Sequence, residues 1–180
     1  MTQILLPPLM LYAACGLVLS LAAHILSFFG IQFGGMPLFI GLHVGIFPLW
    51  IPVVFIAQKM MGGVQRKDFW KVALSGCPVW MRYMTYGFFI YAVVNFAIFI
   101  ILVSMHPPAK GGGAPPPEVL HGFSGHWMAF YSAGLAILTT AYRRGLSNLQ
   151  RKCPFGHEIG WGDKFCPTCG SSIPPLQDQT

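Results

Sequence analysis

Charged residues are scarce in this chain. Of its 180 residues 9% are charged, and Asp and Glu together number only five. A soluble domain of this length carries about 25% charged residues, which excludes a surface that faces water on all sides. The hydrophobic content of 54% and the mean hydropathy of +0.60 indicate a lipid-facing surface instead. The net charge of +6 does not point to nucleic acid, because the basic residues flank apolar runs.

Several sequence features of enzymes and secreted proteins are also missing. No Lys or Arg precedes the first apolar run, so the basic region of a signal peptide is lacking and we expect a retained helix. The sequence has no glycine-rich phosphate loop, no serine nucleophile elbow and no paired acids within its apolar runs. The sequence therefore offers few side chains for general acid–base catalysis, and a non-enzymatic role is favoured.

Four uncharged apolar stretches are long enough to cross a bilayer, which needs about 20 residues of helix. They cover approximately residues 9–29, 37–57, 87–105 and 123–142. A segment in lipid must satisfy its own backbone hydrogen bonds, so each stretch is predicted to be helical. We therefore expect an all-α membrane protein whose transmembrane domain, residues 1–142, is a four-helix bundle.

The connecting loops differ sharply in charge, and this difference predicts the orientation. Basic residues gather in the loop 58–86 and after the fourth stretch: Lys59, Arg66, Lys67, Lys71, Arg82, Arg143, Arg144, Arg151 and Lys152. By the positive-inside rule both regions, and hence both termini, lie in the cytosol of a multi-pass protein in the cell (inner) membrane. The loop 58–86 is either a helix in the headgroup layer or an ordinary topogenic loop. The Pro- and Gly-rich loop 106–122 is predicted to be external and irregular.

The strongest chemical signal is the segment CPFGHEIGWGDKFCPTCG near the C-terminus. Its spacing, Cys-x3-His-x8-Cys-x2-Cys, offers Cys153, His157, Cys166 and Cys169 as four ligands of a tetrahedral zinc ion. The odd total of five cysteines argues against a disulfide scaffold. A segment this short cannot bury enough apolar surface to fold alone, so Zn²⁺ would supply its stability. A redox pair of Cys166 and Cys169, or an unmetallated tail, are the alternatives.

This segment resembles the zinc-ribbon modules appended to many bacterial proteins, whose signature is CPxGH followed by FCPxCG. The resemblance covers residues 152–172. It implies a small β-hairpin zinc ribbon at 153–172, after a basic tether at 143–152 and before a tail at 173–180. It also implies a closed structural site without catalysis. The stretches GCPVWMRYMTYGFFIYAVVNF and GFSGHWMAFY resemble those of uncharacterised bacterial multi-pass membrane proteins, which implies no activity.

The charge of the ribbon predicts what it contacts. Lys164 is its one basic residue, and Glu158 and Asp163 oppose it. Phosphate binding depends on an excess of positive charge, so a protein partner is favoured over nucleic acid.

The other histidines, His24, His43, His106, His121 and His126, all fall in the outer half of the predicted bilayer or at its rim. Ionisable residues at membrane depth suggest a functional site. His24, His43, His106 and His126 are candidates for a haem or second-metal site, and a proton or substrate path is another reading. The hypothesis we favour is that these histidines form hydrogen bonds between helices. Gly41 and Gly45 form a close-packing motif on helix two, with His43 on the opposite face.

Together these features predict a membrane scaffold, regulatory or accessory subunit with a cytosolic structural zinc ribbon. A haem- or metal-binding redox protein that uses the outer histidines is the alternative. A small transporter is a third hypothesis, and it would require an oligomer, because four helices are few for one chain.

Overall fold

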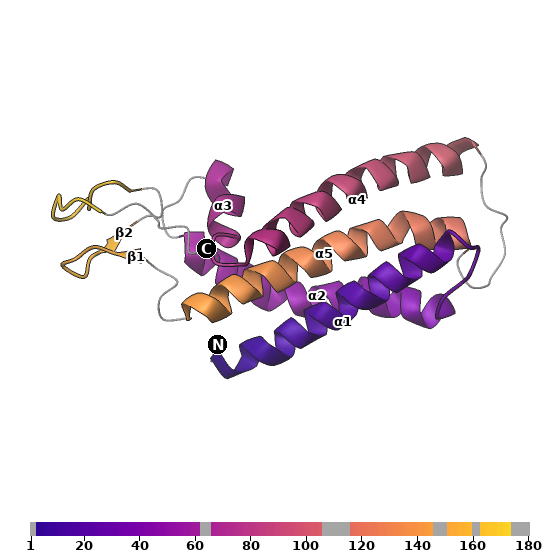
Figure 1. The fold of residues 1–180 in the computed structure, drawn as a ribbon, viewed down its shortest axis with the longest axis horizontal. Coiled ribbons are helices and arrows are strands. Elements are labelled where there is room, and N and C mark those ends of the chain that lie inside the picture. Colours follow the sequence, from indigo (N-terminus) through magenta and orange to yellow (C-terminus); the bar gives the residue numbers. More distant parts are fainter. Residues whose placement is uncertain (1–2, 62–65, 106–115, 146–150, 160–162, 174–180) are drawn as a thin grey trace.

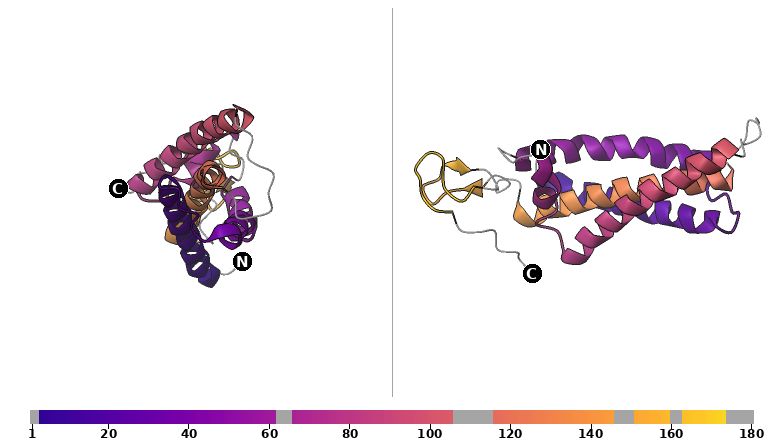
Figure 2. Two further views of the ribbon diagram at one scale, coloured as in Figure 1. Left: turned by 90° about the vertical axis from the view of Figure 1, so that its right-hand side faces the viewer. Right: turned by 90° about the horizontal axis from the view of Figure 1, so that it is seen from above.

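The computed structural model describes residues 3–61, 66–105, 116–145, 151–159 and 163–173. The described residues form four long helices and one short α-helix. The long helices run beside one another along the long axis of the molecule, and the short helix lies at one end (Figures 1 and 2). The elements in chain order are η1 (Gln3–Leu5), α1 (Leu6–Ser27), α2 (Gly35–Met61), η2 (Arg66–Asp68), α3 (Phe69–Ala73), α4 (Val79–Met105), α5 (Pro117–Arg144), β1 (Arg151–Lys152) and β2 (Glu158–Ile159).

Three segments of the described chain are long and apolar enough to cross a membrane. They are Gln3–Ser27, Gly35–Met61 and Val79–Met105, which correspond to η1 with α1, to α2 and to α4. The protein is therefore a helical membrane protein. Helix α5 has a lower hydropathy and is not among the three.

Helix α5 is the least apolar of the long helices because it lies at the centre of the bundle. It packs against α1, α4 and α2, and Ser124, Ser132, Gly134 and Thr140 are buried along it. A helix that touches other helices rather than lipid can carry small and polar residues. The position of α5 in the bundle thus explains its composition.

The helix ends differ from the predicted ones at several places. Helix α4 starts at Val79 rather than near residue 87, so the sequence prediction, which began the span only after Arg82, placed its start too late. Pro78 precedes the helix, and its carbonyl accepts hydrogen bonds from the amides of Met81 and Arg82. Helix α5 starts at Pro117 rather than near 123, with proline in the first turn, where its missing N–H is not needed.

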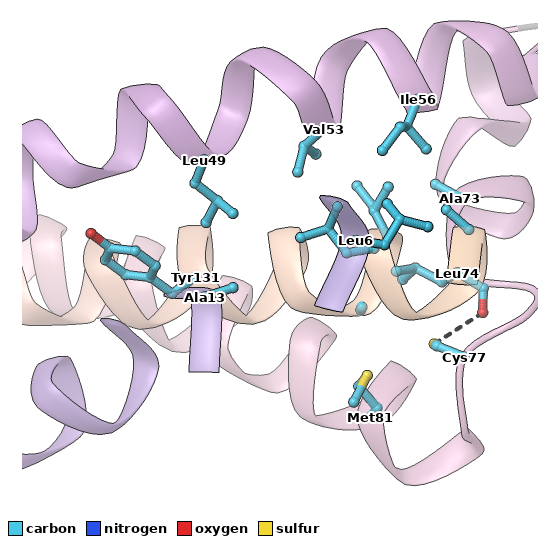
Figure 3. Packing of buried hydrophobic residues seen from close by; sticks show 14 of the residues in the cluster. Leu6, Ala13, Leu49, Val53, Ile56, Ala73, Leu74, Cys77, Met81 and Tyr131 are labelled. Carbon is cyan, nitrogen blue, oxygen red and sulfur yellow. Dashed lines mark hydrogen bonds between the residues drawn. The ribbon is translucent and has the colours of Figure 1, made fainter. Parts of the chain in front are cut away.

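The hydrophobic core follows the inner face of α5. Trp127 and Tyr131 are almost completely buried in it. Figure 3 shows Leu49, Val53 and Ile56 of α2 projecting toward α5, with Leu6 of α1 between them. Leu74, in the loop before α4, belongs to the same cluster as Leu6 and Ile56. The start of α1, the last turns of α2 and this loop therefore meet at one end of the bundle.

The predicted close-packing pair on α2 is only half correct. Gly41 is open, with no atom within 4 Å of a Cβ built there. A Cβ on Gly45 would stand 2.6 Å from the hydroxyl of Tyr12 and 2.7 Å from that of Tyr131. These hydroxyls donate to main-chain carbonyls of α2, Tyr12 to Gly45 at 2.9 Å and Tyr131 to Leu42 at 3.0 Å. Gly45 thus makes room for two interhelical hydrogen bonds.

The two glycines form a matched pair for mutation. We expect Gly45→Ala to lower the free energy of unfolding by about 1–3 kcal/mol, because the methyl group displaces both tyrosine hydroxyls. Gly41→Ala should be neutral or stabilising by up to about 1 kcal/mol, because alanine favours the helix and meets nothing. Thermal unfolding of both variants in the same detergent measures the difference. Equal effects of the two substitutions would contradict this packing.

Candidate metal centre

Two tight turns present the four predicted metal ligands. In the first turn, the Cys153 amide donates to the His157 carbonyl at 2.9 Å, and the Gly156 amide donates to the Cys153 carbonyl at 2.9 Å. Strands β1 and β2 pair antiparallel on either side of this turn, with Lys152 opposite Glu158. Gly156 has a φ of 85°, a conformation that glycine adopts without strain.

The second turn repeats this design. The Gly170 amide donates to the Cys166 carbonyl at 2.8 Å, and the Cys166 amide donates to the Ser171 carbonyl at 2.8 Å. Gly170 has a φ of 70°. An isolated bridge between Phe165 and Ser172 closes the base of the turn. Each turn therefore brings its own pair of ligands to one point.

The ligand atoms of Cys153, His157, Cys166 and Cys169 all lie within 4.8 Å of one another. The Cys153 Sγ atom is 3.7 Å from Cys169 Sγ and 3.4 Å from His157 Nδ1, and Cys166 Sγ is 3.8 Å from that nitrogen. Tetrahedral zinc, with Zn–S of about 2.3 Å and Zn–N of about 2.0–2.1 Å, requires S···S edges of about 3.8 Å and S···N edges of about 3.6 Å. The four side chains therefore fit one zinc-sized ion, with His157 bound through Nδ1.

The segment around the ligands has almost no core of its own. Its buried cluster consists of Cys153, Cys166, Ile159 and Ile173, so two of its four members are themselves ligands. Two isoleucines cannot offset the conformational entropy of ordering the segment. A bound metal is therefore the main source of stability that this geometry offers.

Ser171 is a contributor to the site that the sequence analysis missed. Its hydroxyl lies 3.2 Å from Cys169 Sγ. Hydrogen bonds from Ser171 lower the pKa of the Cys169 thiol to about 7, which favours the thiolate that binds metal. The only available signal was its position two residues after the last ligand.

Within the described residues, this is the one cluster of three or more His, Cys, Asp or Glu side chains that could share a metal ion. The outer histidines that the structure describes do not form such a cluster. His24 and His121 stack with ring centroids 4.4 Å apart, whereas His43 is exposed and accepts a hydrogen bond from Trp127 at 3.4 Å. His126 packs edge-on against Phe96. His106 lies outside the described residues.

His24 is the best-connected of these histidines. Its Nδ1 lies 2.7 Å from Ser124 Oγ, and its Nε2 lies 2.5 Å from the Tyr91 hydroxyl. The single hydroxyl proton of Ser124 is donated to the His121 carbonyl at 3.0 Å, so we assign the proton between Ser124 and His24 to Nδ1. The lone pair on Nε2 then accepts from Tyr91.

The same reasoning applies to the neighbouring ring. Ser27 donates its hydroxyl proton to the His24 carbonyl at 2.6 Å, so its oxygen accepts from His121 Nδ1 at 3.0 Å. Asn95 of α4 adds hydrogen bonds to the carbonyls of His121 and Gly122, at 2.9 and 3.2 Å. These side chains join α1, α4 and α5. Binding of an iron or other metal at His24 would break one of its two hydrogen bonds.

No family model, curated protein or solved structure matches this chain. Fold and site together define its class: a helical membrane protein with a C-terminal Cys₃His cluster that can hold a metal ion.

The hydrogen bonds of His24 lead to a testable difference between two histidines. We expect His24→Ala to reduce the free energy of unfolding by about 1–2 kcal/mol, because Ser124 and Tyr91 lose their shared partner inside the bundle. His43→Ala should cost less, because His43 is exposed and makes one long hydrogen bond. Thermal unfolding and an optical spectrum of both purified variants and the parent provide the comparison. A Soret band in the parent that disappears in His24→Ala would contradict the structural role.

Proposed function

We propose that this protein is a non-enzymatic membrane scaffold or accessory subunit whose C-terminal zinc ribbon binds a cytosolic protein. The observation that carries the proposal is a pair of aromatic side chains on the ribbon. Phe155 is 73% exposed and Phe165 is 64% exposed, one in each ligand-bearing turn. Large aromatic side chains are enriched at the energetic centres of protein–protein interfaces.

The metal site supports a structural rather than a catalytic role. Three thiolates and one imidazole complete the coordination of a tetrahedral zinc ion, so no position is left for substrate or water. The metal would then hold the two turns together and present Phe155 and Phe165. The proposed partner lies in the cytosol, where thiols remain reduced.

The proposal also covers the number of membrane spans and the side of the membrane on which the termini lie. We infer that α5 is the fourth membrane span, so that both termini lie on the cytosolic side. Its 28 residues extend about 42 Å as a helix, which exceeds the hydrocarbon thickness of about 30 Å. Contact with α1, α2 and α4 shields its small and polar residues from lipid. Arg143 and Arg144 at its end agree with the positive-inside rule.

Two other functions remain as rivals. The redox alternative uses haem or a second metal at the outer histidines, and the paired hydrogen bonds of His24 weigh against it. The transporter hypothesis requires several copies of the chain, and a monomer in detergent and in membranes would argue against it.

The scaffold function is tested by crosslinking in cells. A photoreactive amino acid at position 155 or 165 should give one adduct of defined mass, and Cys166→Ser should abolish that adduct because the turns no longer fold around metal. The zinc content of purified Cys166→Ser should fall below about a tenth of one ion per chain. Cys15→Ser, which removes an exposed cysteine of α1, is the matched control and should retain both zinc and adduct.

An adduct that persists in Cys166→Ser, or that forms equally from a photoreactive residue at exposed Ile98 of α4, would contradict a metal-dependent docking surface.

A further inference from the structure

The four ligand side chains of the metal centre differ in how far water reaches them. Cys153 and Cys166 are only 5% and 2% exposed, and His157 is half-buried. Cys169, by contrast, is exposed. The rate at which a cysteine is oxidised depends on how accessible its sulfur is to the oxidant. Cys169 is therefore the ligand that a dissolved oxidant reaches first.

The remaining cysteines of the chain do not compete with Cys169 for such a reagent. All five cysteines belong to the part of the chain that the structure describes. Cys77 is buried, and Cys15, although exposed, lies on α1, which is long and apolar enough to cross a membrane. Lipid around α1 shields Cys15 from an oxidant dissolved in water. Cys169 is thus the one cysteine that is exposed outside the candidate membrane spans.

Metal binding also keeps Cys169 in a reactive form. A cysteine that binds a metal ion does so as the thiolate. The thiolate, and not the thiol, is the nucleophile that peroxides oxidise. The same side chain therefore combines access to water with the charge state that oxidation requires.

A second thiolate lies beside this sulfur. Cys153 Sγ is 3.7 Å from Cys169 Sγ, and the two residues belong to different turns of the ribbon. A disulfide bond is about 2 Å long, so the two sulfurs need to approach by less than about 2 Å to form one. Cysteines that sense oxidants often pair an exposed thiolate with a neighbouring cysteine that resolves the oxidised sulfur. Cys153 is placed to do this for Cys169.

We propose that Cys169 and Cys153 are a peroxide-sensitive pair whose oxidation releases the metal ion. The Cys169 thiolate attacks one oxygen of hydrogen peroxide, which breaks the O–O bond, forms a sulfenic acid and releases hydroxide. The Cys153 thiolate then attacks the Cys169 sulfur, forms the disulfide and displaces a second hydroxide. Both hydroxides take up protons to become water. The two sulfurs together lose the two electrons that the peroxide gains.

Oxidation of this pair removes the stability of the ribbon. Only Cys166 and His157 remain as ligands, and two ligands are too few for a structural zinc site. Because the ribbon buries so little apolar surface, loss of the metal unfolds the two turns. Phe155 and Phe165 are then no longer presented together. The inference rests on the zinc ribbon of the proposed function and adds a reaction that turns the ribbon off.

Peroxide treatment of the zinc-loaded, full-length protein in detergent tests this inference. A chromophoric chelator measures the released zinc, and peptide mass spectrometry without reduction maps the disulfide. We expect each released zinc ion to be accompanied by one Cys153–Cys169 disulfide. Dithiothreitol with added zinc should restore the bound metal, because a disulfide is reversible whereas higher oxidation states of cysteine are not.

Two histidine substitutions provide a matched pair. Cys169→His and Cys166→His each replace one thiolate by an imidazole, so that four zinc ligands remain. We expect Cys169→His to release zinc at least about tenfold more slowly than the parent, because its exposed thiolate is gone. Cys166→His keeps that thiolate and should release zinc within about threefold of the parent rate. The disulfide mapped in the unsubstituted parent identifies the pair independently of both variants.

Three results would overturn the inference while leaving the zinc ribbon intact. They are zinc that stays bound under peroxide, a disulfide between Cys166 and Cys169, and equal rates of release from the two histidine variants. A protein purified without zinc would contradict the metal centre itself, and this inference with it.

Discussion

The bundle depends on hydrogen bonds between its helices, because lipid offers no partners to the polar groups of α5 and of its neighbours. Tyr131 donates to the Leu42 carbonyl, and Tyr12 donates to the Gly45 carbonyl. His24 bridges Ser124 and Tyr91 on two other helices. Each of these bonds joins different helices, so satisfying the polar groups also fixes how the helices pack.

The same requirement explains the distribution of apolar residues. Helix α4 presents Ile90, Val94 and Ile101 outward, as expected for a helix at the edge of a bundle in lipid. Helix α5 directs Ser132, Gly134 and Thr140 toward its neighbours instead. The helix that is least hydrophobic in sequence is consequently the one most enclosed by protein.

Features that depend on neighbouring residues could be predicted from the sequence. The spacing of Cys153, His157, Cys166 and Cys169 named all members of the cluster, because two local turns bring them together. Apolar run length located α1, α2 and α4, although the start of α4 was placed too late. The prediction excluded the first turns of α4 because it allowed no charged residue in a span, whereas Arg82 lies inside the helix.

Features that depend on distant residues could not be predicted. The His24–Ser124 hydrogen bond joins residues 100 positions apart, and no local pattern encodes that pairing. The same holds for Gly41 and Gly45, which are equivalent in sequence and differ only in what lies across from them. Ser171 is different, because it lies only two residues from Cys169; its role was missed because the 3.2 Å approach of its hydroxyl to Cys169 Sγ depends on how the turn folds.

We infer that the C-terminal segment folds around one zinc ion held by three thiolates and one imidazole. X-ray absorption at the zinc edge of the purified full-length protein tests it most directly. We expect one zinc per chain with three sulfur neighbours at about 2.3 Å and one nitrogen at about 2.0–2.1 Å. An oxygen ligand in the first shell, fewer than three sulfurs, or a protein that folds here without zinc would contradict it.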